Sequence, residues 1–318
     1  MTGTSLKHET KRAAPSPTCL YVIGMHRSGT SAVAALSARL GLAMPPADDR
    51  IPATASNRQG HYESRQLVAF NHRLLLRLGG TWTAPPELTP GWVTSAELGD
   101  LRREAARLFA MTYPSRPAAW KDPRLCLLLP FWRTVIEPPA AAVLVVRDPV
   151  EVARSLHARD GLGPLLSLAL WERYVRSACA ALVGLPTLLV DYAQLVGDPV
   201  RGCGQLADFL RPLGVDAPAL SAEQIAEVLD PALRRQGGKE ASHDRLGDSA
   251  GRIMERLQAT HGPHASWQSP ELHDEPDWVT DVLAMRRRLD RVSYELGDVQ
   301  RSRAYRLAGW ARGHRRSA

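Results

Sequence analysis

Short apolar runs alternate with longer amphipathic segments through most of this chain. Runs with the length and composition of buried strands lie at residues 21–23, 118–121, 141–146 and 187–190. Segments with apolar residues at helical spacing lie between and around them, at 66–78, 101–111, 150–158, 165–183 and 201–210. This alternation predicts an α/β fold: a three-layer sandwich in which helices cover both faces of a central parallel sheet.

Loops and ends divide the chain into three parts. Residues 1–18 are polar, lack the features of a secretory signal and are expected to form a disordered tail. Residues 19–275 are expected to form one domain, in which Pro/Gly-rich or loose segments at 44–60, 81–91 and 234–248 have the character of lids or substrate walls. Residues 276–318 are expected to form a basic amphipathic helical tail.

The C-terminal segment has an apolar stripe beside a basic face. The stripe consists of Val282, Met285, Leu289, Val292 and Leu296, and from residue 281 onward there are ten arginines and four acidic residues. A coiled-coil seam, a helix that docks on a protein partner, an anionic membrane surface and a helix packed back on the domain all fit this pattern.

Composition excludes several classes of protein. The net charge of +7 comes mostly from the C-terminal segment, which argues against nucleic-acid binding by the rest of the chain. No apolar run approaches the roughly 20 residues that cross a bilayer. The four cysteines form no CxxC pair and have no histidine at metal spacing. We therefore expect no metal site and a cytoplasmic protein, with the C-terminal helix as one route to the inner face of the membrane.

The segment after the first strand has the pattern of a phosphate-binding loop. Gly24 ends the strand, and Arg27, Ser28, Gly29, Thr30 and Ser31 lead into an alanine-rich helix. Backbone N–H groups of this loop would converge on an anion at the positive end of the helix, which predicts a P-loop-like site. Thr30 occupies the position of the lysine of a nucleotide triphosphatase, and the loop carries its cation at Arg27 instead.

A second group of polar residues follows the strand at 141–146. Arg147 ends this strand, Asp148 is a good helix N-cap and Pro149 fits the first helical position. Ser155 and Arg159 lie four residues apart on the helix that follows. Ligands of parallel sheets bind at the carboxyl edge, so Arg147, Ser155 and Arg159 could together bind a phosphate. Taken alone, they also fit ordinary surface roles.

A third group follows the strand at 118–121. Lys121 stands at its end and can neutralise charge on a leaving phosphate oxygen at the same sheet edge. The alternative is that Lys121 and Asp122 simply pair with each other in a turn.

Together the three groups resemble the sulfotransferases that use 3′-phosphoadenosine 5′-phosphosulfate (PAPS) as cosubstrate. The resemblance covers roughly residues 20–210 and is to the arginine-type RSGT loop of tyrosylprotein and carbohydrate sulfotransferases, which suggests a bacterial member. It implies that the loop from Arg27 to Ser31 holds the 5′-phosphosulfate and that Arg147 and Ser155 hold the 3′-phosphate. It further implies PAPS contacts for Arg159 and Tyr192 and a contact between Lys121 and the sulfuryl group.

The sequence is least informative about which residue acts as the catalytic base. Many cytosolic sulfotransferases have a histidine where this chain has Pro123, so another residue must accept the proton of the acceptor. The resemblance to the tyrosylprotein branch favours Glu63, with a structural role at a helix start as its alternative. His61 and Asp122 remain candidates.

The acceptor is expected to be a hydroxyl compound, and a carbohydrate or glycan is favoured. Trp82, Trp92 and His61 could line its pocket, and a small natural product or a peptidyl tyrosine stays open. The rival hypotheses are a P-loop kinase that uses Mg-ATP with Asp148 as the magnesium ligand, and a non-catalytic nucleotide-binding scaffold. The sequence does not decide the oligomeric state.

Overall fold

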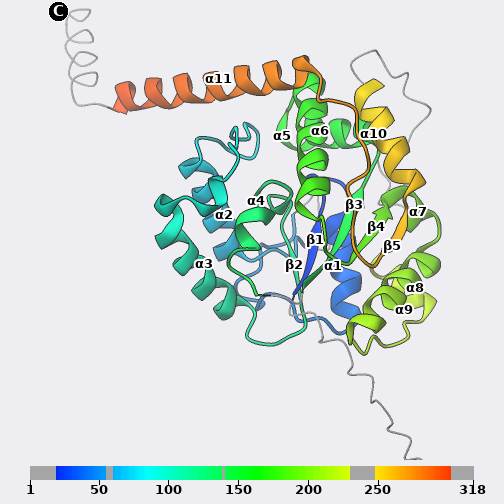
Figure 1. Cartoon of the computed structure of the whole chain (residues 1–318). Coiled ribbons are helices and arrows are strands. Elements are labelled where there is room, and N and C mark those ends of the chain that lie inside the picture. The colour runs from blue at the N-terminus through cyan, green and yellow to red at the C-terminus, as the bar shows by residue number, and fades with distance from the viewer. Residues whose placement is uncertain (1–18, 55–59, 138–139, 230–247, 302–318) are drawn as a thin grey trace, which may run out of the picture.

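The computed structural model describes residues 19–54, 60–137, 140–229 and 248–301. The tail predicted at 1–18 lies outside the described residues, as do most of the loose segment at 234–248 and the end of the C-terminal segment. A five-stranded sheet in the order β2-β1-β3-β4-β5 forms the centre of the domain (Figure 1). Its strands are β1 (Cys19–Ile23), β2 (Ala118–Lys121), β3 (Ala140–Val146), β4 (Thr187–Asp191) and β5 (Gly262–His264).

Four of the strands are parallel, and they are the four that the apolar runs predict. The fifth, β5, pairs antiparallel with β4 at the edge of the sheet. Its sequence is Gly-Pro-His, so it carries no apolar run that could have revealed it. The predicted parallel sheet is therefore confirmed for its four main strands, with one short antiparallel strand added at the edge.

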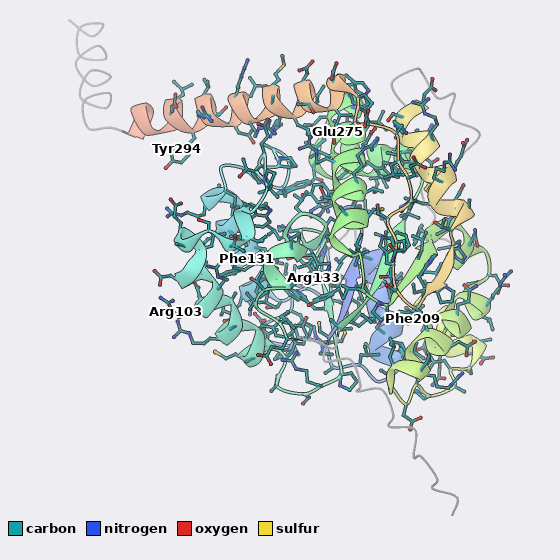
Figure 2. All side chains as sticks on the ribbon, in the orientation of Figure 1. Arg103, Phe131, Arg133, Phe209, Glu275 and Tyr294 are labelled. Atoms are coloured by element: carbon teal, nitrogen blue, oxygen red, sulfur yellow. The ribbon has the colours of Figure 1, made fainter. Side chains whose placement is uncertain are left out.

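Helices cover both faces of the sheet, which makes the molecule three-layered. One hydrophobic core lies between one face of the sheet and α1, α7, α8 and α9. A second core lies between the opposite face of the sheet and α2 to α6 and α10. Phe209 belongs to the first core and Phe131 to the second (Figure 2). The helices are α1 (Thr30–Arg39), α2 (Arg65–Arg77), α3 (Gly99–Thr112), α4 (Leu125–Trp132), α5 (Pro149–Asp160), α6 (Pro164–Ala181), α7 (Tyr192–Gly197), α8 (Pro199–Leu210), α9 (Ala222–Ala226), α10 (Asp248–Ala259) and α11 (Asp277–Arg301), with short 3₁₀ turns at Trp92–Thr94, Ala96–Leu98 and Arg211–Leu213.

The two cores follow from the two-residue period of the strands. In β1, Leu20 and Val22 point to the α1 side, whereas Tyr21 and Ile23 point to the α4 side. Residues of β3 and β4 are divided between the cores in the same way. Because both faces are buried, the interior positions of these strands are apolar, and the strands could be recognised as runs in the sequence.

Two helices depart from what the amphipathic pattern predicts. Helix α4 is apolar on nearly all sides and buried, so it shows no amphipathic spacing and its sequence did not reveal it. The first turns of α11 pack against α6, with Val279 and Leu283 fully buried. Of the described helices, none has the length and apolar character needed to cross a membrane.

Candidate active site

The carboxyl ends of four adjacent parallel strands bring the predicted polar residues to one edge of the sheet. The loop at residues 24–29 follows β1, Lys121 ends β2, Arg147 follows β3 and Tyr192 follows β4. Strand β1 lies between β2 and β3, and its loop therefore occupies the centre of this edge. Chain connections diverge to either side of such a point, and open α/β sheets bind their ligands there.

The loop after β1 depends on two close backbone approaches. A Cβ atom at Gly24 would lie 2.4 Å from the carbonyl oxygen of Val145, so only glycine fits beside β3. At Gly29 the backbone has φ of +94°, and a Cβ atom would lie 2.1 Å from Cδ2 of Tyr192. Gly29 is also the N-cap of α1 and has no side chain to cap the helix. The N-terminal end of α1 is thus open toward the loop, as an anion site requires.

Arg27 and Arg147 are joined through the loop. Nη1 of Arg147 donates to the carbonyl oxygen of Arg27 at 3.1 Å, and Nε of Arg27 donates to Oγ of Ser155 at 2.8 Å. The Arg147 guanidinium lies 4.9 Å from the centre of the Tyr192 ring and also bonds the Glu151 carboxylate at 2.8 Å. The predicted pair of Arg147 and Ser155 is therefore adjacent to the loop arginine.

Buried donors of this cluster point to an anionic ligand. Ser28 Oγ and Arg147 Nη2 are buried, and neither has a hydrogen-bond partner among the described residues. Burial and the neighbouring charges of Arg159 and Arg147 lower the pKa of Arg27 to about 10. Crowded, partly desolvated cations repel one another, and an anion bound between them would relieve that repulsion. These residues thus fit the phosphate groups of a nucleotide.

Lys121 forms a buried ion pair with Glu63, 58 residues earlier in the chain. Arg124 Nη1 lies 3.9 Å from the second oxygen of Glu63. Glu63 immediately precedes Ser64, which caps α2 by accepting a hydrogen bond from Leu67 N at 3.1 Å. The start of α2 therefore delivers Glu63 to the end of β2.

Asp122 does not pair with Lys121, so the simple turn pairing considered for these two residues is wrong. Asp122 is fully buried and accepts hydrogen bonds from Asn71 Nδ2 at 2.8 Å and Arg124 Nη1 at 3.0 Å. Burial raises the pKa of this carboxyl, and Glu63 raises it further, while Arg124 and Asn71 act in the opposite direction. The hydrogen bond to Asp122 therefore holds the Arg124 guanidinium near the Glu63 carboxylate.

Two histidines lie among these cations. Burial, followed by the charges of Lys121, Arg159 and Arg27, lowers the pKa of His61 to about 4. Burial and the same cations, together with Arg124, hold the pKa of His26 well below its usual value. Both shifts favour the neutral ring, which has one nitrogen that can accept a hydrogen bond but which takes up a proton less readily than an ordinary histidine.

An aromatic group borders the cations. The His26 ring lies 4.5 Å from that of Trp82 and 5.9 Å from that of Tyr174, measured between centroids. The Arg159 guanidinium lies 5.7 Å from the centre of the Trp82 ring, and its Nε pairs with Asp160 at 2.7 Å. Trp82 thus lies beside these cations, and both Trp82 and Trp92 also pack against the hydrophobic core. A role of either ring in an acceptor pocket stays a prediction.

Most predicted site residues come together, and a few further ones were missed. The loop from Arg27 to Ser31, Arg147, Ser155 and Tyr192 form one connected group, and Lys121, Glu63, His61 and Asp122 form its neighbour. Sequence reasoning missed His26, Asn71 and Arg124. Arg124 directly follows the Lys121-Asp122-Pro123 motif, which was a usable signal, but nothing near Asn71 indicated its bond to Asp122. Within the described part of the chain, no group of three or more His, Cys, Asp or Glu residues is arranged to hold a metal ion.

Comparison with known proteins gives structural neighbours only. The sequence matches no protein-family model, and the search of curated proteins finds no relative. Among solved structures, the chain is similar to the sulfotransferase domain of the Synechococcus olefin synthase, with 20% identity over 77% of this chain and 96% of that one and a TM-score of 0.43. It is also similar to the sulfotransferase domain of the curacin biosynthetic pathway, with 16% identity over 78% and 99% of the two chains and a TM-score of 0.45. For a sulfotransferase from Mycobacterium tuberculosis, the corresponding values are 19%, 68%, 71% and 0.33.

Proposed function

We propose that this protein is a sulfotransferase that moves a sulfuryl group from PAPS to a hydroxyl acceptor, giving a sulfate ester and 3′-phosphoadenosine 5′-phosphate (PAP). The observation that carries the proposal is the group of cations at the carboxyl ends of β1, β2 and β3, of which Lys121 and Arg147 are buried and Arg27 is half-buried. Arg27, Lys121 and Arg147 come from three adjacent strand ends, and Ser28 Oγ and Arg147 Nη2 have no protein partner among the described residues. The RSGT resemblance of the loop agrees with the same ligand.

Each residue of the site has a task that its position supports. The loop from Arg27 to Ser31 would bind the 5′-phosphosulfate, and Arg147 and Ser155 the 3′-phosphate, with Tyr192 stacked beneath Arg147. The bound nucleotide supplies an activated sulfuryl group with PAP as the leaving group. Lys121 and Arg27 would stabilise the negative charge that grows on the leaving phosphate, which is the largest electrostatic demand of the reaction.

Glu63 is the proposed base that takes the proton of the acceptor hydroxyl. Its carboxylate is buried and is held by Lys121 and Arg124. Proton acceptance by a positioned side chain contributes about 10²–10⁴-fold to a rate. Asp122 has both carboxylate oxygens engaged by Asn71 and Arg124, which makes it a weaker candidate.

For the acceptor we propose a carbohydrate or glycan, in preference to a small natural product or a peptidyl tyrosine. Trp82 is the partly exposed member of the group that it forms with the buried His26 and Tyr174, and its ring could pack against the apolar face of a sugar ring. We place the protein in the cytoplasm. All four cysteines are unpaired and buried, which suits a reducing compartment.

The nucleotide is tested by calorimetry with PAP, 5′-AMP and Mg-ATP. We expect the purified chain to bind PAP without metal. Arg147→Ala should weaken PAP binding by at least about tenfold, since one charge-assisted contact contributes about 1.5–3 kcal/mol. It should change 5′-AMP binding much less, because only PAP carries the 3′-phosphate.

The matched control for this experiment is Arg154→Ala. Arg154 lies on α5 one residue before Ser155, but its side chain is exposed, so its loss should leave both affinities unchanged. Equal losses for PAP and 5′-AMP in Arg147→Ala would contradict the assignment of the 3′-phosphate. A preference for Mg-ATP over PAP would favour the kinase hypothesis.

The base is tested by comparing Glu63→Gln with His61→Gln. We expect Glu63→Gln to reduce release of PAP from PAPS and acceptor by roughly 10²-fold or more while PAP affinity stays close to that of the wild type. His61→Gln should have a smaller effect. Unchanged turnover in Glu63→Gln would move the base to His61 or, failing that, to Asp122, and a scaffold without catalytic activity would show no turnover in any variant.

A further inference from the structure

The loop at residues 80–87 is folded back on itself. Thr81 N donates to the carbonyl oxygen of Ala84 at 2.8 Å, and Ala84 N donates to Oγ1 of Thr81 at 3.0 Å. A Cβ atom at Gly80 would lie 2.4 Å from the backbone nitrogen of Pro86, so the two ends of the loop touch. Because the loop is closed by its own backbone, a contact at any of its residues restrains the whole loop.

The ring of Trp82 connects this loop to two groups of the candidate active site. Its centroid lies 4.5 Å from that of the His26 ring, in the loop after β1, and 5.7 Å from the Arg159 guanidinium on α5. A guanidinium within about 6 Å of an indole ring is attracted by that ring. The position of Trp82 therefore helps to fix where the charge of Arg159 lies.

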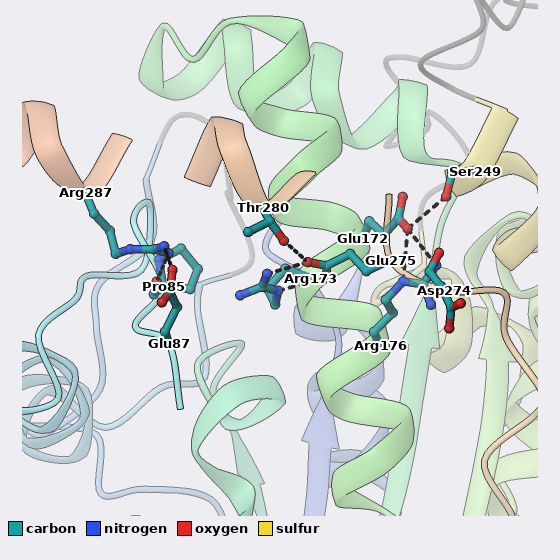
Figure 3. Close-up of polar contacts among 10 residues, drawn as sticks. All are labelled: Pro85, Glu87, Glu172, Arg173, Arg176, Ser249, Asp274, Glu275, Thr280 and Arg287. Carbon is teal, nitrogen blue, oxygen red and sulfur yellow. Dashed lines mark hydrogen bonds and ion pairs between the residues drawn. The ribbon is translucent and has the colours of Figure 1, made fainter. Parts of the chain in front are cut away.

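Two helices hold the backbone of this loop. Oη of Tyr174 on α6 donates to the carbonyl oxygen of Trp82 at 2.8 Å. Nη1 of Arg287 on α11 donates to the carbonyl oxygen of Pro85 at 2.8 Å, and the same guanidinium pairs with Glu87 (Figure 3). The side chain of Arg287 is 14% exposed and that of Glu87 is 67% exposed, and an ion pair in contact with water contributes little. The bond to the carbonyl oxygen is therefore the main contact of Arg287 with the loop.

The start of α11 is fixed to α6. Leu283, one turn before Arg287, is fully buried, and α11 packs against α6. Glu275, just before the helix, accepts a hydrogen bond from Nε of Arg173 on α6 at 2.9 Å (Figure 3). Arg173 directly precedes Tyr174 in the sequence. One segment of α6 thus positions both the start of α11 and the loop.

We propose that Arg287 is a positioning residue of the candidate active site: it holds the loop at residues 80–87 so that the Trp82 ring stays against His26 and Arg159. The proposal rests on the proposed function, because the predicted PAPS contact of Arg159 is what the ring would keep in place. It gives the start of α11 a part in the site, although Arg287 and Pro85 are 202 residues apart in the chain.

The position of Trp82 is tested first without any ligand, by ¹⁹F NMR on the full chain labelled with 5-fluorotryptophan. The chain has eight tryptophans, and the signal of Trp82 is identified by its loss in Trp82→Phe. We expect this signal to shift by more than its linewidth in Arg287→Ala and to stay in place in Arg288→Ala, since Arg288 is the exposed neighbour on α11. An unmoved signal in Arg287→Ala would overturn the proposal, whether or not the protein is a sulfotransferase.

Calorimetry with PAP tests the consequence for the site. We expect Arg287→Ala to weaken PAP binding about two- to fivefold, which corresponds to one cation–π contact, and Arg288→Ala to leave it unchanged. Arg287→Lys, which can still donate to the carbonyl oxygen of Pro85, should restore most of the affinity and return the NMR signal toward its wild-type position.

A double-mutant cycle separates positioning from a general structural role. In the Trp82→Ala background, Arg287→Ala should have no further effect on PAP affinity, because Arg287 acts through that ring. Additive losses would contradict the proposal and assign Arg287 to the docking of α11 alone. A wild-type chain that does not bind PAP would instead contradict the proposed function, and the NMR result would then decide the positioning role by itself.

Discussion

Replacing Lys121 by methionine is expected to lower sulfuryl transfer by about 10³-fold. Methionine keeps the length of the side chain but removes the charge that we propose faces the leaving phosphate, and the loss of one such transition-state contact typically costs 10²–10³-fold. The same change leaves the buried Glu63 carboxylate with Arg124 as its remaining cation, at 3.9 Å. Breaking a buried ion pair costs about 3–5 kcal/mol, so we also expect a lower free energy of unfolding. Turnover and urea denaturation measure the two effects.

A double variant separates the catalytic loss from the loss of stability. In Lys121→Met/Glu63→Gln both charges of the pair are removed together, so most of the stability should return while turnover stays low. Lys121→Arg, which keeps the charge, should retain more activity than Lys121→Met or the double variant. Near wild-type turnover in Lys121→Met would exclude Lys121 from the transition state and leave the pair with a structural role.

Gly29→Ala is expected to be the most damaging single change in the phosphate-binding loop. An alanine at φ of +94° is strained, and its Cβ atom would lie 2.1 Å from Tyr192 Cδ2, so the tyrosine ring must move. That ring supports the Arg147 guanidinium, which in turn holds the Arg27 carbonyl oxygen at 3.1 Å. We expect PAP affinity to fall at least about 10²-fold, because both arginines that we propose bind the anion are displaced.

Gly161→Ala provides the matched control for the effect of backbone strain alone. Gly161 also has a positive φ, of +68°, but a Cβ atom there would have no atom within 4 Å. Its substitution should cost only the strain of the left-handed conformation, about 1–2 kcal/mol in the free energy of unfolding, and should leave PAP binding intact. The double variant Gly29→Ala/Tyr192→Ala should recover part of the stability that Gly29→Ala loses. Equal effects at Gly29 and Gly161 would show that the contact with Tyr192 has no role.

The sequence by itself determined the layered fold and most of the cation cluster. Strands of a parallel sheet are buried on both faces, so β1 to β4 could be recognised as apolar runs without tertiary information. The polar residues that end these runs were also predictable as neighbours, because carboxyl ends of parallel strands share one edge. Arg27, Lys121 and Arg147 could therefore be grouped although they are far apart in the chain.

Only the tertiary structure decided how the carboxylates and histidines are used and which face of α11 remains open. Glu63 reaches Lys121 because α2 packs beside α3 and begins next to the end of β2, and Asp122 turns to Asn71 and Arg124 in the same packing. Local periodicity is a property of one segment, whereas these contacts depend on where two segments dock. The stripe on α11 was visible in the sequence, but only the structure shows that Val282 packs on the domain while the residues of the stripe from Met285 onward remain exposed.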